Sequence, residues 1–353
     1  MLKSIENLES IIKNRHGRRR GRLVRDYFLI SVILIGGGLI TSGLLEIYYR
    51  YRESRENVSL FQQEVAAAAA FKVEQFIDQI ETALRTATKS PVIARKGLSD
   101  EFQSELTRLL LVTPAIEEVA ALDLTGRIHL QASRFRAILP EDKEELPPRA
   151  AFETAKNGKS FIGQVYFARG SEPYNHITVP VERFVGDLIG ILWAKVNLKY
   201  IWEVIQDIKV GKAGYAYIVT RSGDLVAHPD LSLVLGRKNL AQLAPVQAAF
   251  QSRSPVEKGQ SINAESHQGN KVFASYMLIP SLDWAVIIEQ PLDEAYAPLY
   301  ASVFRTSSLL LIGLGMALLA SIFVARRVVQ PLELLRWGAE RIGAGDLNHQ
   351  LEI

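Results

Sequence analysis

The chain has 353 residues, 48% of them hydrophobic, and carries 41 Lys and Arg against 38 Asp and Glu, a formal net charge of +3. The apolar content and the near balance of charge exclude a disordered chain and a protein that binds nucleic acid over its whole surface. There are no cysteines, which excludes disulfides, thiolate metal sites and a cysteine nucleophile.

The N-terminal segment, residues 1–27, is basic, and residues 13–25 read KNRHGRRRGRLVR. The run Phe28–Leu45 that follows carries no charge and is close to the minimum length for crossing the hydrocarbon core. It leads into GLLEIYYRYR rather than into the small residues of a signal-peptide cleavage site. We therefore predict a retained transmembrane helix over 28–48. Glycines within it, Gly37 and Gly38, are a weak signal of helix–helix packing.

A long helical pattern comes next, over residues 54–89. Its apolar residues recur at spacings of three and four, which is the period of an α-helix, and Pro91 ends the run. A narrow apolar stripe of this length favours a stalk helix that packs on its own domain at one side and on a partner helix at the other. A helix that lies on its own domain alone is the alternative.

Two later stretches share one pattern of strand, glycine-containing turn and strand. They are residues 117–133, EEVAALDLTGRIHLQAS, and residues 214–230, GYAYIVTRSGDLVAHPD. Both read as β-hairpins, and further strand-like runs follow each of them. The repetition predicts two tandem α+β modules built on antiparallel sheets. We place a distal module at about 90–200 and a proximal module at about 208–292, within an exported segment spanning 49–305.

A second uncharged run, residues 306–325, predicts a second transmembrane helix. Arginines precede the first span and follow the second, so both outer flanks are predicted to face the cytoplasm; they are Arg18, Arg19, Arg20, Arg22, Arg25, Arg326 and Arg327. Residues 326–353 then place Pro331 just past the bilayer, an apolar seam at heptad spacing, and a glycine-rich end. Such a seam predicts a parallel helical bundle and hence a homodimer.

The exported segment resembles the double Cache domain, a PAS-like extracytoplasmic sensor of bacterial receptors. The stretch IKVGKAGYAYIVTRSGDLVAHPDLSLVLGRKNL, residues 208–240, is similar to the opening of its membrane-proximal module, and SEPYNHITVPV, residues 171–181, to a strand pair of its distal module. Residues 325–353 resemble the start of a HAMP signal-transmission module. The order span, Cache, span, HAMP implies a multi-pass receptor of the bacterial inner membrane, with its sensor in the periplasm or extracellular space.

In the HAMP-like segment, the residues expected to transmit the signal are Pro331, Leu332, Leu335, Ile342, Gly345 and Asp346. The chain stops before a second HAMP helix, so we expect a cytoplasmic output domain in the same polypeptide after Ile353. A histidine kinase is the leading expectation for it. An adenylate or diguanylate cyclase and a chemoreceptor signalling helix are the alternatives.

The resemblance places the small-molecule ligand in the distal module. Candidate ligand-binding residues are Arg134, Arg136, Tyr166, Tyr174 and His176, because a guanidinium can clamp a carboxylate and the aromatic side chains lie on or beside the next strands. Amino-acid-binding members of the family carry R-x-W-Y after the first hairpin. The corresponding stretch here, RFRAILPEDKEELPPR, has no Trp or Tyr, which weighs against an amino-acid ligand.

In the proximal module we assign structural roles to Tyr215, Tyr217 and His228, because alternating tyrosines share one face of a strand and His-Pro-Asp reads as a turn. No two histidines stand at metal-ligand spacing, and no catalytic motif is visible. We therefore expect no metal, no cofactor and no catalytic residue within 1–353. A periplasmic protein-docking module without a small-molecule ligand is the rival from another class of function.

Overall fold

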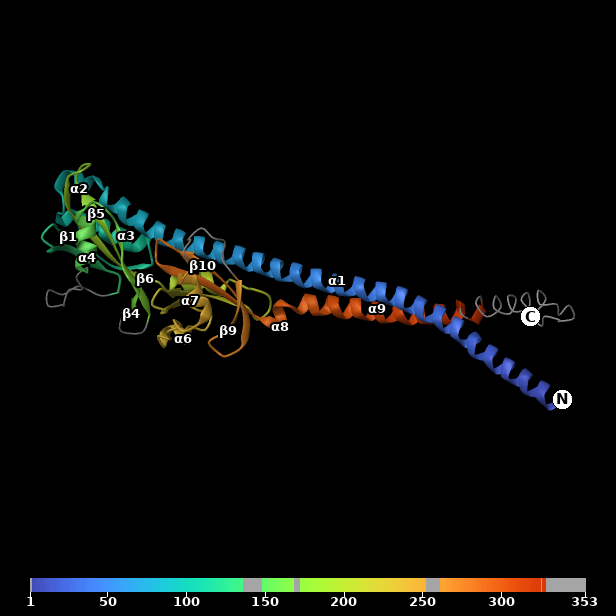
Figure 1. Cartoon of the computed structure of the whole chain (residues 1–353). Helices are drawn as coiled ribbons and strands as arrows, with labels where there is room; N and C mark the ends of the chain where they lie inside the picture. Colours follow the sequence, from blue (N-terminus) through green and yellow to red (C-terminus); the bar gives the residue numbers. More distant parts are fainter. Residues whose placement is uncertain (1, 136–147, 168–171, 252–260, 325, 328–353) are drawn as a thin grey trace. The chain divides into compact units, whose positions relative to one another are not determined.

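The computed structural model describes residues 2–135, 148–167, 172–251, 261–324 and 326–327. Arg136 and the six candidate signal-transmission residues, which begin at Pro331, lie outside the described residues. The chain divides into two compact units, one formed by residues 56–295 and the other by residues 1–55 with 296–353. Figure 1 traces the helices and strands along the chain.

Two helices form the described part of the second unit: the first portion of α1 (Leu2–Thr88) and α9 (Ala297–Val324). Both are long and apolar enough to cross a membrane. Gly36 and Gly43 are buried against α9, where an added Cβ would lie 3.2 Å from Leu314 and 2.3 Å from Leu310. Gly37 and Gly38, the glycines singled out in the sequence, have nothing within 4 Å. Close packing within the chain therefore uses a different pair of glycines.

The first sheet lies in the distal part of residues 56–295 and contains six strands. Its order is β2-β1-β6-β5-β3, with β4 also pairing with β5. The strands are β1 (Ile116–Asp123), β2 (Ile128–Ser133), β3 (Phe161–Ile162), β4 (Tyr166–Phe167), β5 (Pro173–Glu182) and β6 (Leu188–Asn197). The helices beside it are α2 (Pro91–Lys96), the 3-10 turn η1 (Asp100–Phe102), α3 (Gln103–Val112) and α4 (Arg149–Lys156).

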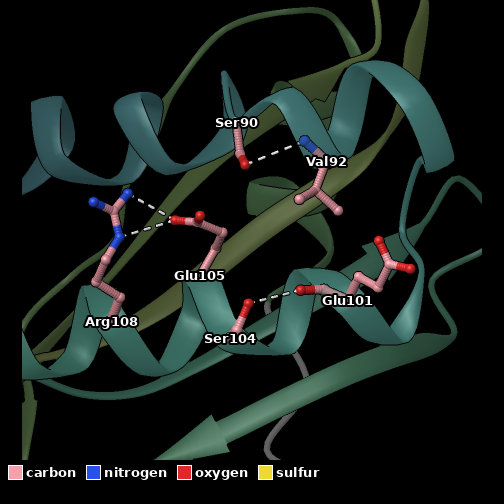
Figure 2. Close-up of polar contacts among 6 residues, drawn as sticks. All are labelled: Ser90, Val92, Glu101, Ser104, Glu105 and Arg108. Atoms are coloured by element: carbon pink, nitrogen blue, oxygen red, sulfur yellow. Dashed lines mark hydrogen bonds and ion pairs between the residues drawn. The ribbon is translucent and has the colours of Figure 1, made fainter.

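Local chemistry explains where the short helix α2 begins and supports α3. The hydroxyl of Ser90 accepts a hydrogen bond from the backbone N–H of Val92, and a proline at the first helical position needs no donor there (Figure 2). On α3, the Arg108 guanidinium donates to the Glu105 carboxylate at 2.7 Å, a pair one turn apart on an exposed face. Each contact stabilises the helix in which it lies.

The second sheet has five strands in the order β8-β7-β11-β10-β9, all antiparallel. The strands are β7 (Tyr215–Thr220), β8 (Leu225–Ala227), β9 (Ser261–Glu265), β10 (Lys271–Ile279) and β11 (Trp284–Pro291). The helices are α5 (Tyr200–Gln206), which connects the two sheets, α6 (Leu231–Leu235), α7 (Ala244–Gln251) and α8 (Leu292–Ala295). The predicted class, α+β with two antiparallel-sheet modules on a long N-terminal helix, is confirmed.

Both predicted hairpins form, as β1–β2 and β7–β8. Gly126 and Gly223 stand in their turns with φ of +86° and +84°, a backbone region that favours glycine. At Gly223 space is short as well, because an added Cβ would lie 2.4 Å from the backbone nitrogen of Ala241. The glycine in each turn, which made the two stretches look alike, therefore has a steric reason.

The inner faces of both sheets share one hydrophobic core with α1, whose residues Val73, Ile77 and Leu84 are buried in it. The outer faces differ. The distal sheet has a small outer cluster covered by α4, centred on Trp193. The proximal sheet has a larger one covered by α6 and α7. Period-two alternation along each strand thus leaves two outer faces available for a site.

Candidate ligand-binding site

Three of the five candidate residues meet on the outer face of the distal sheet. Tyr166, on β4, hydrogen-bonds His176, on β5, with 2.5 Å between the phenol oxygen and Nε2. The ring centroids of Tyr166 and His176 are 4.3 Å apart, and those of Tyr166 and Tyr174 are 6.0 Å apart. Strand alternation explains the grouping, because residues 174 and 176 project from the same face of β5.

A fourth aromatic residue, Trp193 on β6, completes this group, with its ring 5.0 Å from that of His176. Trp193 and Thr178 are opposite each other in the β5–β6 register, and both are 0% exposed. In the described part of the chain, the indole Nε1 of Trp193 and the hydroxyl of Thr178 have no hydrogen-bond partner. Buried polar atoms are nearly always hydrogen-bonded, so these two atoms are candidates for contact with a ligand.

Tyr174 lies at the edge of this group within a polar network. Its hydroxyl oxygen lies 3.2 Å from a carboxylate oxygen of Glu117 and 3.2 Å from one of Glu172, so the two share its single hydrogen. The amide of Asn197 donates to both carboxylates at 2.7 Å. Burial, together with the charge of Glu117, raises the pKa of the Tyr174 phenol, so the hydroxyl stays a donor. The ammonium of Lys195 stands 4.9 Å from the centre of the Tyr174 ring. This end of the site therefore offers both acidic and basic groups.

Arg134 lies elsewhere. Its guanidinium donates to the backbone carbonyls of Ile116, at 3.4 Å, and Thr113, at 3.3 Å, beside the C-terminus of α3. Arg134 follows Ala132 by two residues and so shares its inward face. A cation near a helix C-terminus is favourable. The structure gives Arg134 this contact and does not bring it to the aromatic group.

β4 serves two modules. Tyr166 belongs to the distal group, whereas Phe167 packs against the outer cluster of the proximal module. Arg237 stacks its guanidinium 5.4 Å from the Phe167 ring centre and donates to the Phe167 carbonyl at 3.4 Å. Arg237 itself has a φ of +53°, a conformation uncommon outside glycine. The distal site is thus one residue away from a contact between modules.

In the proximal module, Tyr217 is buried and Tyr215 is half-buried, and their hydroxyls share one acceptor. Tyr215 and Tyr217 donate to the carboxylate of Glu289, which is fully buried on β11. Glu289 and Trp193 are not among the residues that the sequence patterns single out. An acid inside the apolar strand DWAVIIEQPL was the available signal for the first, and nothing in LIGILWAKVNL distinguished the second from core.

Comparison with protein families gives two matches. The model of the family dCache_1, described as a Cache domain, matches residues 50–299. The HAMP domain model matches residues 323–353. The Cache match covers well over half of the chain.

Among curated proteins, the chain is 24% identical over 341 residues to the methyl-accepting chemotaxis protein PctB of Pseudomonas aeruginosa, covering 91% of this chain and 50% of that protein. It is 26% identical over 194 residues to the methyl-accepting chemotaxis protein McpG of Pseudomonas putida, covering 52% of this chain and 30% of that protein. The chain thus spans half, or less, of the length of these relatives.

Solved structures share the fold. The ligand-binding domain of PctB in complex with L-Gln aligns with a TM-score of 0.50 at 22% identity, over 70% of this chain and 98% of that one. The ligand-binding domain of the Campylobacter jejuni chemoreceptor Tlp3 in complex with 4-methylisoleucine aligns with a TM-score of 0.54 at 12% identity, over 69% of this chain and 94% of that one.

Proposed function

This chain belongs to the Cache domain family and carries the sensor half of a receptor, and we propose that the receptor is a bacterial chemoreceptor whose small-molecule ligand binds the distal module. The curated relatives favour this output, because those cited are methyl-accepting chemotaxis proteins. From the sequence alone, a histidine kinase is the leading expectation for the output and a chemoreceptor is one of the alternatives. Under this proposal the sensor lies outside the inner membrane, and the signalling region follows in the same polypeptide.

The observation that carries the ligand site is the buried pair Trp193 and Thr178. An indole N–H is a donor only, so its partner must be an acceptor, such as a carbonyl, carboxylate or hydroxyl oxygen. A hydroxyl can donate or accept. The rings of Tyr166 and His176 stand beside the pair and supply apolar surface. The ligand is therefore a small organic molecule with at least one acceptor oxygen.

A ligand changes signalling only by binding one conformational state more tightly than the other. The test is a hybrid receptor, with residues 1–353 joined in frame to the signalling region of another chemoreceptor and expressed in a motile strain without receptors of its own. Ligands come from a thermal-shift screen of amino acids, organic acids, amines and sugars against the purified chain.

We expect a compound that raises the unfolding midpoint to bias swimming of cells that carry the hybrid. Trp193→Phe should weaken both responses, and Tyr200→Phe, on α5, is the matched aromatic control. A chain that folds and responds to no compound would sink the small-molecule proposal and favour a protein partner. Binding without any swimming response, together with phosphotransfer from a hybrid carrying a kinase region, would favour the histidine kinase.

The functional unit is proposed to be a homodimer. Phe61 and Phe71, on the α1 portion of the sensor unit, are 52% and 66% exposed, and exposed aromatic rings along a stalk helix favour a partner helix. Because the chain has no cysteine, Phe71→Cys introduces a single thiol. We expect oxidation in membranes to cross-link it, with the exposed Asp187→Cys as control. Equal cross-linking at both positions would count against a dimer through α1.

A further inference from the structure

A group of polar and aromatic side chains lies on the outer face of the proximal sheet, apart from the distal site. Glu289 is opposite Tyr215 in the β7–β11 register and is 0% exposed. Its two carboxylate oxygens accept hydrogen bonds from the hydroxyl of Tyr215, at 2.7 Å, and from that of Tyr217, at 2.6 Å. In the described part of the chain, this carboxylate is hydrogen-bonded to these two phenols. A buried acid held by neutral donors is unusual.

His228 stands beside this carboxylate group and is 4% exposed. Its Nδ1 lies 3.2 Å from the carbonyl oxygen of Asp230 and 2.9 Å from the backbone nitrogen of Asp230. Because that backbone N–H can only donate, Nδ1 is its acceptor. Burial lowers the pKa of His228 to about 4, so the imidazole is neutral near pH 7. An imidazole whose Nδ1 is an acceptor carries its hydrogen on Nε2.

That Nε2–H is buried and has no hydrogen-bond partner in the part of the chain that the structure describes. The His228 ring centre lies 5.3 Å from that of Tyr215, 5.8 Å from that of Tyr217 and 5.6 Å from that of His267. The unpartnered donor therefore belongs to the same aromatic group as the carboxylate. Tyr215 and His267 are only partly buried, which leaves this side of the group in contact with solvent.

We propose that the proximal module has a second small-molecule site, formed by His228, Glu289 and the surrounding rings, that takes a neutral hydroxylated molecule such as a polyol or a monosaccharide. The charges of the group decide the class. An anion would accept from His228 but would sit beside the Glu289 carboxylate. A cation would be attracted to Glu289 but cannot accept from His228 Nε2–H. A hydroxyl group does both, because it accepts one hydrogen bond and donates another.

The rings add a second reason for this class. Tyr215 and His267, the partly buried rings of the group, offer flat apolar surface on which the C–H face of a polyol or sugar can pack. Such sites combine a mostly apolar lining with a few converging polar groups. The site is independent of the distal proposal, because none of its residues belongs to the distal group.

The test uses the whole chain in detergent, titrated calorimetrically with glycerol, myo-inositol, D-ribose and D-glucose. Ethylammonium and acetate are the charged comparison probes. His228→Asn retains an acceptor near the position of Nδ1 for the Asp230 N–H and removes Nε2–H. We expect at least one hydroxylated probe to bind and His228→Asn to weaken it tenfold or more, while Trp193→Phe leaves it unchanged. Tyr215→Phe, which keeps the ring, replaces His228→Asn should that variant fail to fold.

A ¹⁵N spectrum of the histidines supplies a direct readout, because a hydroxyl that accepts from Nε2–H shifts that nitrogen and its proton. Absence of binding by every hydroxylated probe, in a chain with a cooperative thermal transition, would overturn the proposal and leave an ordered water as the partner of Nε2–H. Preferential binding of ethylammonium or acetate would overturn the ligand class. A distal ligand that still binds His228→Asn keeps the two sites distinguishable.

Discussion

The distal and proximal modules repeat one sheet architecture but close their outer faces differently. The distal face is covered by one short helix, α4, and in the described part of the chain the buried polar atoms of Trp193 and Thr178 have no hydrogen-bond partner. The proximal face is covered by α6 and α7 over a larger apolar cluster, and its acid, Glu289, is held by two phenols. Two modules with the same fold therefore differ in stability and in ligand binding, because both properties depend on which buried polar atoms are hydrogen-bonded.

Removing the buried acid should have the largest effect on stability. Glu289→Ala takes the acceptor from two phenols at once, and we expect it to lower the free energy of unfolding by about 3 kcal/mol. Glu117→Ala, in the distal module, removes a partly exposed carboxylate that water can replace, and should cost less than about 1 kcal/mol. Urea unfolding of the chain in detergent measures both. Equal losses would break the contrast between the modules.

Single phenol hydroxyls give the next largest difference. The Tyr217 hydroxyl donates to a carboxylate at 2.6 Å in the core, so Tyr217→Phe should cost about 2 kcal/mol. The Tyr174 hydroxyl makes two longer bonds of 3.2 Å at the edge of the distal site, so Tyr174→Phe should cost about half as much. Thermal midpoints of the two variants, compared with that of Tyr200→Phe, test the order. A reversed order would contradict it.

Acid should affect the modules in different pH windows. The folded-state pKa of His228, about 4, is below its usual 6.5, so the unfolded chain binds a proton first and this contribution to stability is lost as pH falls from 6.5 toward 4. We expect a loss on the order of 2 kcal/mol. Burial raises the pKa of Glu289, which acts in the opposite direction.

The variant His228→Asn isolates the histidine contribution, because its stability should fall less steeply between pH 6.5 and 4 than that of the unchanged chain. In the distal module, the Thr125 hydroxyl and neighbouring backbone N–H groups lower the pKa of Asp123. Its stabilising contribution is therefore lost only below the usual pKa of an aspartate, near 4. Identical slopes for His228→Asn and the unchanged chain would refute the assignment of a neutral buried imidazole.

The smallest effect should have the opposite sign. Thr178→Val replaces a buried hydroxyl, which has no hydrogen-bond partner among the described residues, with a methyl group of similar size on a β-strand. We expect the ligand-free chain to gain up to about 1 kcal/mol. The same variant should bind a distal ligand more weakly. Thermal midpoints with and without ligand check both parts. A destabilised ligand-free variant would show that the hydroxyl is satisfied by something other than a ligand.

Much of the fold follows from local sequence signals. The apolar runs, the helical period of the stalk and the glycine turns at Gly126 and Gly223 are properties of short stretches, and they predicted the helices and both hairpins. The site was harder. Tyr166, Tyr174 and His176 are candidates because the family resemblance points to the distal module and they lie on or beside its strands, and alternation along β5 puts Tyr174 and His176 on one face. Trp193 comes from another strand, and only the β5–β6 register sets it opposite Thr178.

Arg134 shows the limit of reasoning from residue type. A guanidinium can bind a carboxylate ligand, but it can also donate to backbone carbonyls at a helix end. The alternation of side chains along β2 directs Arg134 to such carbonyls. Glu289 shows the converse. It follows the apolar run AVII in sequence, whereas its partners Tyr215 and Tyr217 lie 74 and 72 residues earlier in the chain. Partners so distant in sequence are set by sheet pairing, which local patterns do not reveal.

The two-residue strand β4 has a consequence for how such a receptor can diversify. Tyr166 and Phe167 project to opposite sides, one toward the distal site and the other into the proximal cluster with Arg237 against its ring. Either residue can be substituted without changing the other, so ligand preference and the contact between the modules can evolve separately. The two residues are joined by one peptide bond, however, and a ligand that displaces this backbone moves both side chains. Mutation can therefore change Tyr166 or Phe167 alone, whereas ligand binding that moves the backbone displaces both residues.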